Sequence, residues 1–517
     1  MHVSTQPFAD QTFLPFGLRQ SLSVFQQPHY LETAVQGFFN ILSDRKGQTL
    51  VLGGDGQALT QHFLQIILKL AAANGFGRVI VGTQGLLSPV IVSYLIRRHS
   101  AIAGILLSIH PSLSGGDIHL DCYLSNGAKA PTTILEAIQE RIQIIQNYYI
   151  SEERDISLNR LGTFALETLE VEIINSAAVY EKLMDSIFDF DAIQHFFKQQ
   201  SFRLSVTCLD PTNYAYSQHL LEKKLGLFPG TVNFEMAPTL LDPLIGTTNL
   251  GWKIDPPDLT CVLSGTQYGI FGTHIGVTAS DSLAIMMAHA PLIPAYRGNV
   301  TAVARSLFGS VAIDHVALAL GIPCYETPSE WFLMSQLMDV QGVTFAGNEE
   351  GEIGASYSRE TDPIWPLLFW LNILAARPQS ILQIVQNHWQ QYGRNFHGCQ
   401  IYENFYLPPL YEKLQNLGSL TLKGKEYGRY QVAYSHPLSF YDAVKFQQIE
   451  QLGLALVFTE GSRLIFRLDP LVGHTDRGNL TVYVESYEPD GERQLFPYET
   501  VLSPLFDLAE AIAELTT

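Results

Sequence analysis

The sequence predicts a multidomain α/β protein, and three observations favour this fold class. The chain has 517 residues, which is more than one domain usually contains. Hydrophobic residues make up 46% of it, so the chain can bury sizeable cores and does not have the composition of a disordered protein. Apolar runs alternate with segments of helical spacing, as in sheets whose strands are joined by crossover helices.

The first α/β stretch begins near Gln48. Each strand is predicted by an apolar run that ends in polar or glycine residues, and these runs are TLVLGGDG (49–56), RVIVGTQG (78–85) and AGILLS (103–108). Residues 59–75 and 88–99 lie between them with helical spacing, and Asn74-Gly75 is a typical helix stop. Crossover connections predict mostly parallel strands, whose carboxyl ends carry functional loops. We expect these loops at Gly54–Gly56, Thr83–Gly85 and Ser108–Gly116.

Later elements follow a second α/β pattern and then change character. Residues 238–259 are rich in turn-forming residues and predict a loop. Next come a predicted helix at 280–290, a strand that runs into a loop at 343–351 and a strongly apolar helix at 365–377. Alternating patterns at 454–468 and 480–488 predict a hairpin before a final helix, so we expect an α+β end domain.

The charge balance argues against nucleic acid as a partner. Lys and Arg number 31 against 50 Asp and Glu, which gives a formal charge of -19, whereas a nucleic-acid binder needs a basic surface. No apolar run is long enough to span a membrane, and the N-terminus lacks the pattern of a signal peptide. The five cysteines have no metal-site spacing, so we expect reduced, mostly buried thiols and a cytoplasmic protein without membrane contact.

Several stretches, in order along nearly the whole chain, resemble phosphoglucomutases of the α-D-phosphohexomutase superfamily. They include FGLRQSLSVFQ (16–26), LGGDG (52–56), YLSNGAKAP (123–131), YETPSEW (325–331) and EGSRLIFRL (460–468). The resemblance implies a four-domain architecture, with three related α/β domains of mixed sheets and a C-terminal α+β domain around a central cleft. The expected boundaries are 1–190, 191–279, 280–393 and 394–517. The implied ancestral reaction interconverts glucose 1-phosphate and glucose 6-phosphate through a bisphosphate.

The family's phosphoryl-carrying serine is the first missing part. The family loop T-A-S-H-N-P aligns with Leu107-Ser108-Ile109-His110-Pro111, which places Ile109 at the nucleophile position. An isoleucine side chain cannot carry a phosphoryl group. Ser108 lies one residue earlier, where the side chain of a strand points to the opposite face. A displaced serine at Ser108, Ser112 or Ser114 is the alternative.

The family's Mg²⁺ loop has also changed. The three aspartates of D-G-D-G-D-R bind the metal in the family, and the aligned segment Leu263–Gln267 contains no carboxylate. Ser264, Gly265 and Thr266 are poor ligands for a hard divalent cation that prefers anionic oxygens. Asp255 and Asp258 lie upstream among prolines, where we interpret them as surface turn residues. We therefore predict no cofactor, with Mg²⁺ only if the alternative holds.

Two loops that read the sugar and its phosphate in the family are partly kept. The sugar loop G-E-E-S-F-G aligns with Gly347–Glu352 and keeps Glu349. The phosphate loop S-G-T-G-S aligns with Asp469–Thr475, and an aspartate at its entrance would repel phosphate. Gln57 and Asp121 replace a family arginine and lysine, so the cleft is expected to be less positive. The positions that resemble substrate-binding residues are Arg19, His110, Arg305, Glu326, Glu349 and Arg359, and each could equally support the fold.

These changes predict a phosphoglucomutase-like pseudoenzyme. It would have lost mutase activity and would act by binding a protein partner or a sugar phosphate. The alternatives are an active phosphoglucomutase with a displaced serine and metal site, and a different enzyme that reuses the cleft. The fold alone does not choose between them, because function belongs to sites.

Overall fold

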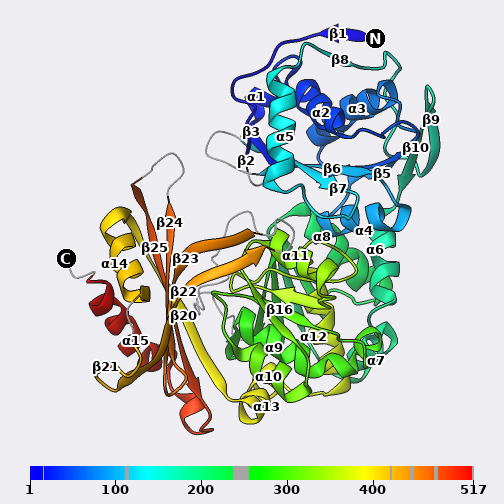
Figure 1. The fold of residues 1–517 in the computed structure, drawn as a ribbon. Coiled ribbons are helices and arrows are strands. Elements are labelled where there is room, and N and C mark those ends of the chain that lie inside the picture. The colour runs from blue at the N-terminus through cyan, green and yellow to red at the C-terminus, as the bar shows by residue number, and fades with distance from the viewer. Residues whose placement is uncertain are drawn as a thin grey trace. The chain divides into compact units, whose positions relative to one another are not determined.

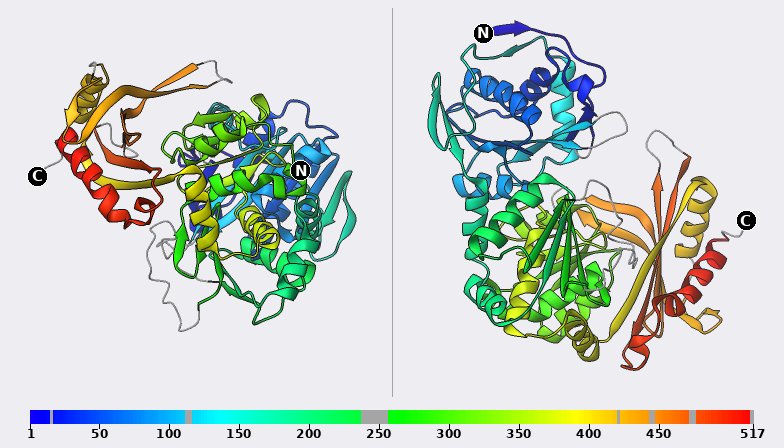
Figure 2. Two further views of the ribbon diagram at one scale, coloured as in Figure 1. Left: turned by 90° about the horizontal axis from the view of Figure 1, so that it is seen from below. Right: turned by 180° about the vertical axis from the view of Figure 1, so that it is seen from behind.

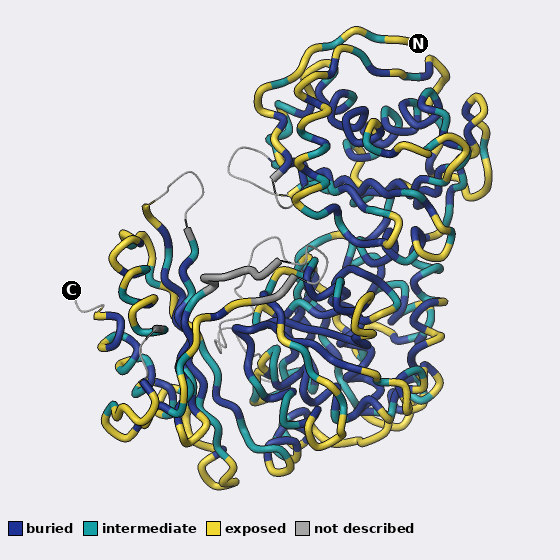
Figure 3. The backbone as a smooth tube through the Cα atoms, viewed as in Figure 1, coloured by how far each residue is buried: buried dark blue, intermediate teal, exposed yellow. Residues whose placement is uncertain are grey.

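The computed structural model describes residues 1–14, 17–110, 116–236, 256–419, 422–442, 447–470 and 476–514. The chain forms two compact units (Figure 1). The first comprises Met1–Gly269, Leu292–Asn299 and Glu352–Pro378, and the second comprises Ile270–Pro291, Val300–Gly351 and Gln379–Thr517. Within each unit the central strands and the helix faces packed on them are buried, and the connecting segments are exposed (Figure 3).

The first unit is built on an eight-stranded mixed sheet. Its order is β2 (Phe13–Leu14), β3 (Gly17–Ser21), β7 (Asp117–Leu124), β6 (Ala103–His110), β4 (Thr49–Gly54), β5 (Arg78–Leu86), β10 (Leu169–Ile174) and β9 (Gly162–Leu166). Strand β4 is parallel to both β5 and β6, which confirms the predicted parallel strands. Strand β7 is antiparallel to β6 and to β3, so the sheet is mixed.

Helices cover both faces of this sheet. Helices α2 (Tyr30–Ile41), α3 (Ala58–Ala73) and α5 (Thr132–Gln143) lie on one face, and α4 (Pro89–His99) lies on the other (Figure 1). The ends of two helices lie where the sequence predicts them. Ser88 caps α4 by accepting a hydrogen bond from Ile91 N at 3.4 Å, and α3 ends at Asn74. Apolar residues of the sheet and of α2, α3 and α5 form one buried cluster.

A second sheet carries the segment that aligns with the metal loop. Its order is β12 (Val232–Met236), β11 (Leu204–Cys208), β13 (Leu259–Ser264), β14 (Gln267–Gly272) and β15 (Ile275–Val277), and the boundary between the units falls within β14. Most of the predicted loop at 238–259 lies outside the described residues, and Leu259 already belongs to β13. Other elements of the first unit are α1 (Leu22–Phe25), α6 (Ser176–Asp185), α7 (Phe190–Gln199), α8 (Pro211–Gln218), β1 (His2–Ser4), β8 (Asn147–Tyr149), β19 (Ile353–Ala355) and α12 (Ile364–Ala376).

The second unit contains parallel strands and an antiparallel sheet. Strand β16 (Val303–Ser306) pairs in parallel with β17 (Cys324–Thr327) and β18 (Phe345–Gly347), next to helices α9 (Ala279–His289), α10 (Ala312–Leu320) and α11 (Trp331–Val340). The antiparallel sheet has the order β20 (Arg394–Tyr406), β25 (Arg477–Glu488), β24 (Arg463–Pro470), β23 (Gln447–Phe458), β22 (Tyr430–Asp442) and β21 (Glu426–Tyr427). Helices α14 (Leu407–Ser419) and α15 (Tyr498–Ala513) pack on one face of it (Figure 2). The antiparallel strands β23, β24 and β25 confirm the predicted hairpin pattern, and α15 confirms the predicted final helix.

Two further expectations concern the described residues. Cys122, Cys208 and Cys261 are buried, Cys324 is half-buried and Cys399 is exposed, and all are free thiols. Among the residues that the structure describes, every helix is too short or too polar to cross a lipid bilayer.

Candidate functional site

Ile109, which we expect at the family's nucleophile position, lies near the end of β6, and its side chain faces the apolar core. Ile109 packs against the buried cluster of the first unit, on the same side of the strand as Ile105 and Leu107. Ser108 and His110 project from the opposite side, and Ser108 Oγ lies 2.9 Å from His110 Nε2. Successive side chains of a strand point to opposite faces of the sheet, so the Ser108 hydroxyl does not lie on the face to which Ile109 points. Ser112 and Ser114 lie outside the described residues.

Asp55 joins the end of β4 to the end of β6. Its Oδ2 accepts a hydrogen bond from Ile109 N at 2.8 Å. Gln57 donates to the same carboxylate through its backbone N and its Nε2, both at 3.0 Å. The loops expected at Gly54–Gly56 and at Ser108 are thus brought together. The third expected loop, Thr83–Gly85, is instead part of β5, where Thr83 Oγ1 donates to Ile174 O at 2.9 Å.

Two stacked histidines flank this position. The rings of His110 and His119 lie 3.9 Å apart with an interplanar angle of 23°. Burial lowers the pKa of His119 to about 4, and the neighbouring His110 and Arg19 act in the same direction. The pKa of His110 is also lowered, chiefly by burial, although Asp121, Asp55 and Asp210 oppose the shift. Arg19 is exposed on β3, directly opposite His119 in the strand register.

Asp121, which we expect at the position of a family lysine, forms an ion pair with Lys129. Lys129 Nζ lies 3.0 Å from Asp121 Oδ2. Burial opposes the charged form of Lys129, but Asp121 and Glu360 outweigh it and raise its pKa. Burial raises the pKa of Glu360 to about 8 despite the nearby ammonium group. Lys129 and Asp121 form an ion pair without net charge, so the expectation that positive charge has left this region stays a prediction.

The segment that aligns with the metal loop is a tight turn. Gly265 and Thr266 connect β13 to β14, and Gly265 adopts a φ of 55°, which favours glycine. Asp210 is the carboxylate beside this turn. It accepts hydrogen bonds from Gly265 N at 3.1 Å, from Asn213 N at 2.8 Å and from Asn213 Nδ2 at 2.7 Å.

These residues do not fit Mg²⁺. Thr266 Oγ1 donates to Glu352 Oε1 at 2.6 Å, and the oxygens of Asp210 already accept from amide groups. A magnesium ion requires nearly octahedral oxygen ligands, which this turn does not offer. Across the described part of the chain, no three His, Cys, Asp or Glu side chains are grouped in a way that could hold a metal. Asp258 instead accepts a hydrogen bond from Arg203 N at 2.8 Å, and Asp255 lies outside the described residues.

The retained glutamate of the sugar loop is held at the carboxyl ends of parallel strands. Glu349 follows β18, Ser306 ends β16 and Ser329 follows β17. Ser329 Oγ donates to Glu349 Oε1 at 2.6 Å, and Ser306 Oγ donates to Glu349 Oε2. Carboxyl ends of parallel strands meet at one edge of a sheet, which is where α/β proteins bind ligands. Glu349 is therefore an ordered hydrogen-bond acceptor at such an edge.

Other residues that resemble substrate-binding positions make contacts within the fold. Arg305 is 3% exposed and forms ion pairs with Asp314, at 2.6 Å, and with Glu326. These carboxylates outweigh the effect of burial and raise the pKa of Arg305. Arg359 is 4% exposed and donates to Ser356 O at 2.9 Å and to Ser358 O at 2.8 Å. Their assignment to substrate binding stays a prediction.

The first residue of the phosphate loop forms an ion pair with an arginine on its own strand. Arg467 Nε lies 2.7 Å from Asp469 Oδ1, and Thr481 Oγ1 donates to Asp469 Oδ2 at 3.2 Å. The Arg467 guanidinium lies 4.7 Å from the centre of the Phe308 ring. The Arg467 guanidinium is therefore paired with Asp469, and an anionic ligand would have to compete with this carboxylate for it. Residues 471–475 of this loop lie outside the described residues.

Sequence reasoning missed several of these groups. Lys129 lies inside the quoted stretch YLSNGAKAP, and Arg467 lies inside EGSRLIFRL, so both could have been considered. Ser329 lies inside the quoted stretch YETPSEW, whereas Ser306 lies in none of the quoted stretches. The sheet register brings both serines to Glu349.

Known proteins resemble this chain over its whole length. Residues 10–149 and 279–392 match the families described as phosphoglucomutase/phosphomannomutase α/β/α domain I and domain III. Residues 408–517 match the family described as the phosphoglucomutase-1 C-terminal domain.

Individual relatives agree with these matches. A phosphoglucomutase of Rhizobium radiobacter is 35% identical over 99% of this chain and 96% of its own length. Phosphoglucomutase-like protein 5 of Rattus norvegicus is 33% identical over 99% of this chain and 96% of its own. Among solved structures, the open form of pp63/parafusin from Paramecium, described as a phosphoglucomutase, has a TM-score of 0.89 and 27% identity, covering 99% of this chain and 96% of its own. The chain therefore belongs to the phosphoglucomutase family of the α-D-phosphohexomutase superfamily.

Proposed function

We propose that this chain is a phosphoglucomutase relative that has lost mutase activity and acts by binding a protein partner or a glucose phosphate. Ile109 carries the proposal. It stands at the family's phosphoserine position, its side chain packs into the core and its N–H is held by Asp55. A side chain without a hydroxyl, thiol, amine or carboxylate cannot accept and return a phosphoryl group.

The surroundings of Ile109 support the same proposal. Phosphoryl transfer depends mainly on charge stabilisation by metal ions and basic groups. The turn at Gly265 and Thr266 offers no anionic metal ligand of its own, and Asp469 neutralises Arg467. Restoring one serine would leave these deficits in place.

Glu349 supports the part of the proposal in which the chain still binds a glucose phosphate. The carboxylate is ordered by Ser306 and Ser329, and carboxylates accept hydrogen bonds from sugar hydroxyls. Because phosphate would have to compete with Asp469 for Arg467, a glucose phosphate should bind through its sugar more than through its phosphate.

One observation favours the alternative of an active mutase with a displaced serine. Ser108 Oγ lies 2.9 Å from His110 Nε2, and a hydroxyl next to an imidazole is the usual arrangement of an activated nucleophile. In that case Ser108 would carry the phosphoryl group.

A coupled assay for glucose 6-phosphate formation separates the two functions. Wild type and Ser108→Ala would be assayed with glucose 1-phosphate, glucose 1,6-bisphosphate and Mg²⁺, and their intact masses would be measured. We expect no activity above the blank and no bound phosphate in either protein. Activity and stoichiometric phosphate that disappear in Ser108→Ala would overturn the proposal and establish the alternative. Calorimetric titration of the inactive protein with glucose 1-phosphate then tests sugar-phosphate binding directly.

A further inference from the structure

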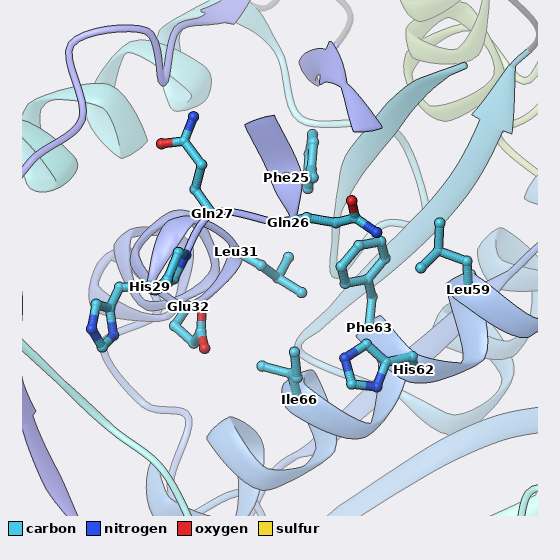
Figure 4. A pocket seen from close by; sticks show the side chains of 11 residues that line it. Phe25, Gln26, Gln27, His29, Leu31, Glu32, Leu59, His62, Phe63 and Ile66 are labelled. Carbon is cyan, nitrogen blue, oxygen red and sulfur yellow. The ribbon is translucent and has the colours of Figure 1, made fainter. Parts of the chain in front are cut away.

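A cavity lies on the first unit, formed by residues of α1, α2, α3 and the segment 26–29 (Figure 4). Its volume is about 350 Å³, within the range of small-molecule sites. In Figure 4, Leu31 and Glu32 of α2 face Phe63 and Ile66 of α3 across the opening. None of these residues belongs to the positions discussed above.

The walls of the cavity combine apolar side chains with the polar side chains of Gln26, Gln27, His29, Glu32 and His62. Phe25 and Leu31 are 1% exposed and Phe63 is 3% exposed, so these side chains are fixed in the core. Leu59 and Ile66 are half-buried and complete the wall. Such a wall favours an aromatic or branched aliphatic group, because contact removes apolar surface from water.

Glu32 gives the cavity its charge. Apart from the histidines His29 and His62, it is the one ionisable residue among the described residues that line the cavity. Burial raises the pKa of its carboxyl group, while its own backbone N–H and both histidines act in the opposite direction. No Lys or Arg of the described chain forms an ion pair with it. The helix dipole also favours a carboxylate in the first turn of α2, but it does not account for the cavity beside Glu32.

One side chain at the rim of the cavity is held in place by the protein itself. His29 precedes α2 with a φ of 71°, a left-handed conformation that is uncommon for residues other than glycine. Its Nδ1 lies 2.7 Å from Tyr148 OH, so the ring is held in one orientation. Unusual backbone conformations of this kind persist where the surroundings hold them, and they are frequent at ligand sites.

We propose that this cavity binds a small molecule with a protonated amine at one end and an aromatic or branched aliphatic body. The ammonium group would lie beside the Glu32 carboxylate, and the body would pack against Phe25, Phe63 and Ile66. The faces of the aromatic rings also attract cations. Anions of the same shape are excluded, because the carboxylate repels them.

Titration of the full-length protein with tryptamine tests the site, with indole-3-propionate as the anion of similar body. Binding would be followed by ligand-observed NMR. We expect saturable binding of tryptamine and none of indole-3-propionate. Glu32→Gln should weaken tryptamine binding about tenfold, since an ion pair in a half-buried site contributes on the order of a factor of ten. Glu136→Gln, which changes an exposed glutamate on α5, should leave it unchanged.

Filling the cavity provides a second test. Ile66→Trp should abolish tryptamine binding, and a thermal melt checks that the variant is folded. If it does not fold, Glu32→Gln alone decides. Absence of saturable tryptamine binding to wild type, equal binding by wild type and Glu32→Gln, or equal binding of the anionic probe would each overturn the proposal.

Discussion

Lowering the pH should destabilise the second unit through one buried histidine. His388 lies on α13 (Ile381–Tyr392) and is 4% exposed. Its ring lies 4.9 Å from that of Tyr392, and its Nδ1 has no hydrogen-bond partner among the described residues. Burial lowers the pKa of His388 to about 3, and the charge of the nearby His289 acts in the same direction.

The sign and size of the effect follow from linkage. A histidine in the unfolded chain has a pKa of about 6.5, so between about pH 6.5 and pH 3 the unfolded state binds a proton that the folded state does not. The contribution to stability is therefore complete above about pH 6.5 and is lost as the pH falls, by about 1.4 kcal/mol per pH unit. Between about pH 8 and pH 5, the loss in the free energy of unfolding should be about 2 kcal/mol.

Native-state hydrogen exchange of α13 at the two pH values measures this loss after correction for intrinsic exchange rates. His388→Gln removes the titrating group, and its free energy of opening should fall by about 2 kcal/mol less than that of wild type between the two pH values. His2→Gln, which changes an exposed histidine, should behave as wild type. Only the difference between the two pH values matters, so a uniform loss of stability in His388→Gln does not affect the comparison. Equal pH dependence in wild type and His388→Gln would refute the reasoning.

The remaining predictions concern the altered family motifs. Ile109→Ser should not restore mutase activity in the coupled assay, because the turn at Gly265 and Thr266 still lacks carboxylates; activity above that of Ile109→Ala would show that this interpretation of the turn is wrong. Mg²⁺ should not raise the melting temperature relative to Na⁺ at equal ionic strength, whereas a specific site would add about 2.7 kcal/mol at a hundredfold excess over Kd. Asp469→Ser should release Arg467 and tighten glucose 1-phosphate binding severalfold in calorimetry, with the exposed Asp476→Ser as control; an unchanged affinity would contradict a competing role for Asp469.

Local sequence patterns predicted several of the elements. The apolar runs at 49–56, 78–85 and 103–108 became β4, β5 and β6, and the apolar segment at 365–377 became α12. These predictions hold because buried positions are apolar and recur along the sequence with the repeat of the helix or strand that carries them. The domain boundaries at residues 190, 279 and 393 stay predictions, since compactness depends on contacts between distant segments.

The sequence by itself determined which functional groups stand where we expect the family motifs. Ile109, Gly265 and Asp469 are predicted replacements that need no structure to be seen, because the functional group of each residue follows from its identity. Only the tertiary structure decided which charges meet. Ser306 and Ser329 reach Glu349 through strand pairing that joins segments far apart in the chain. Lys129 reaches Asp121 because the chain folds back on β7. Electrostatic interactions fall off with distance and depend on burial, and both quantities are set by the packing of the folded chain.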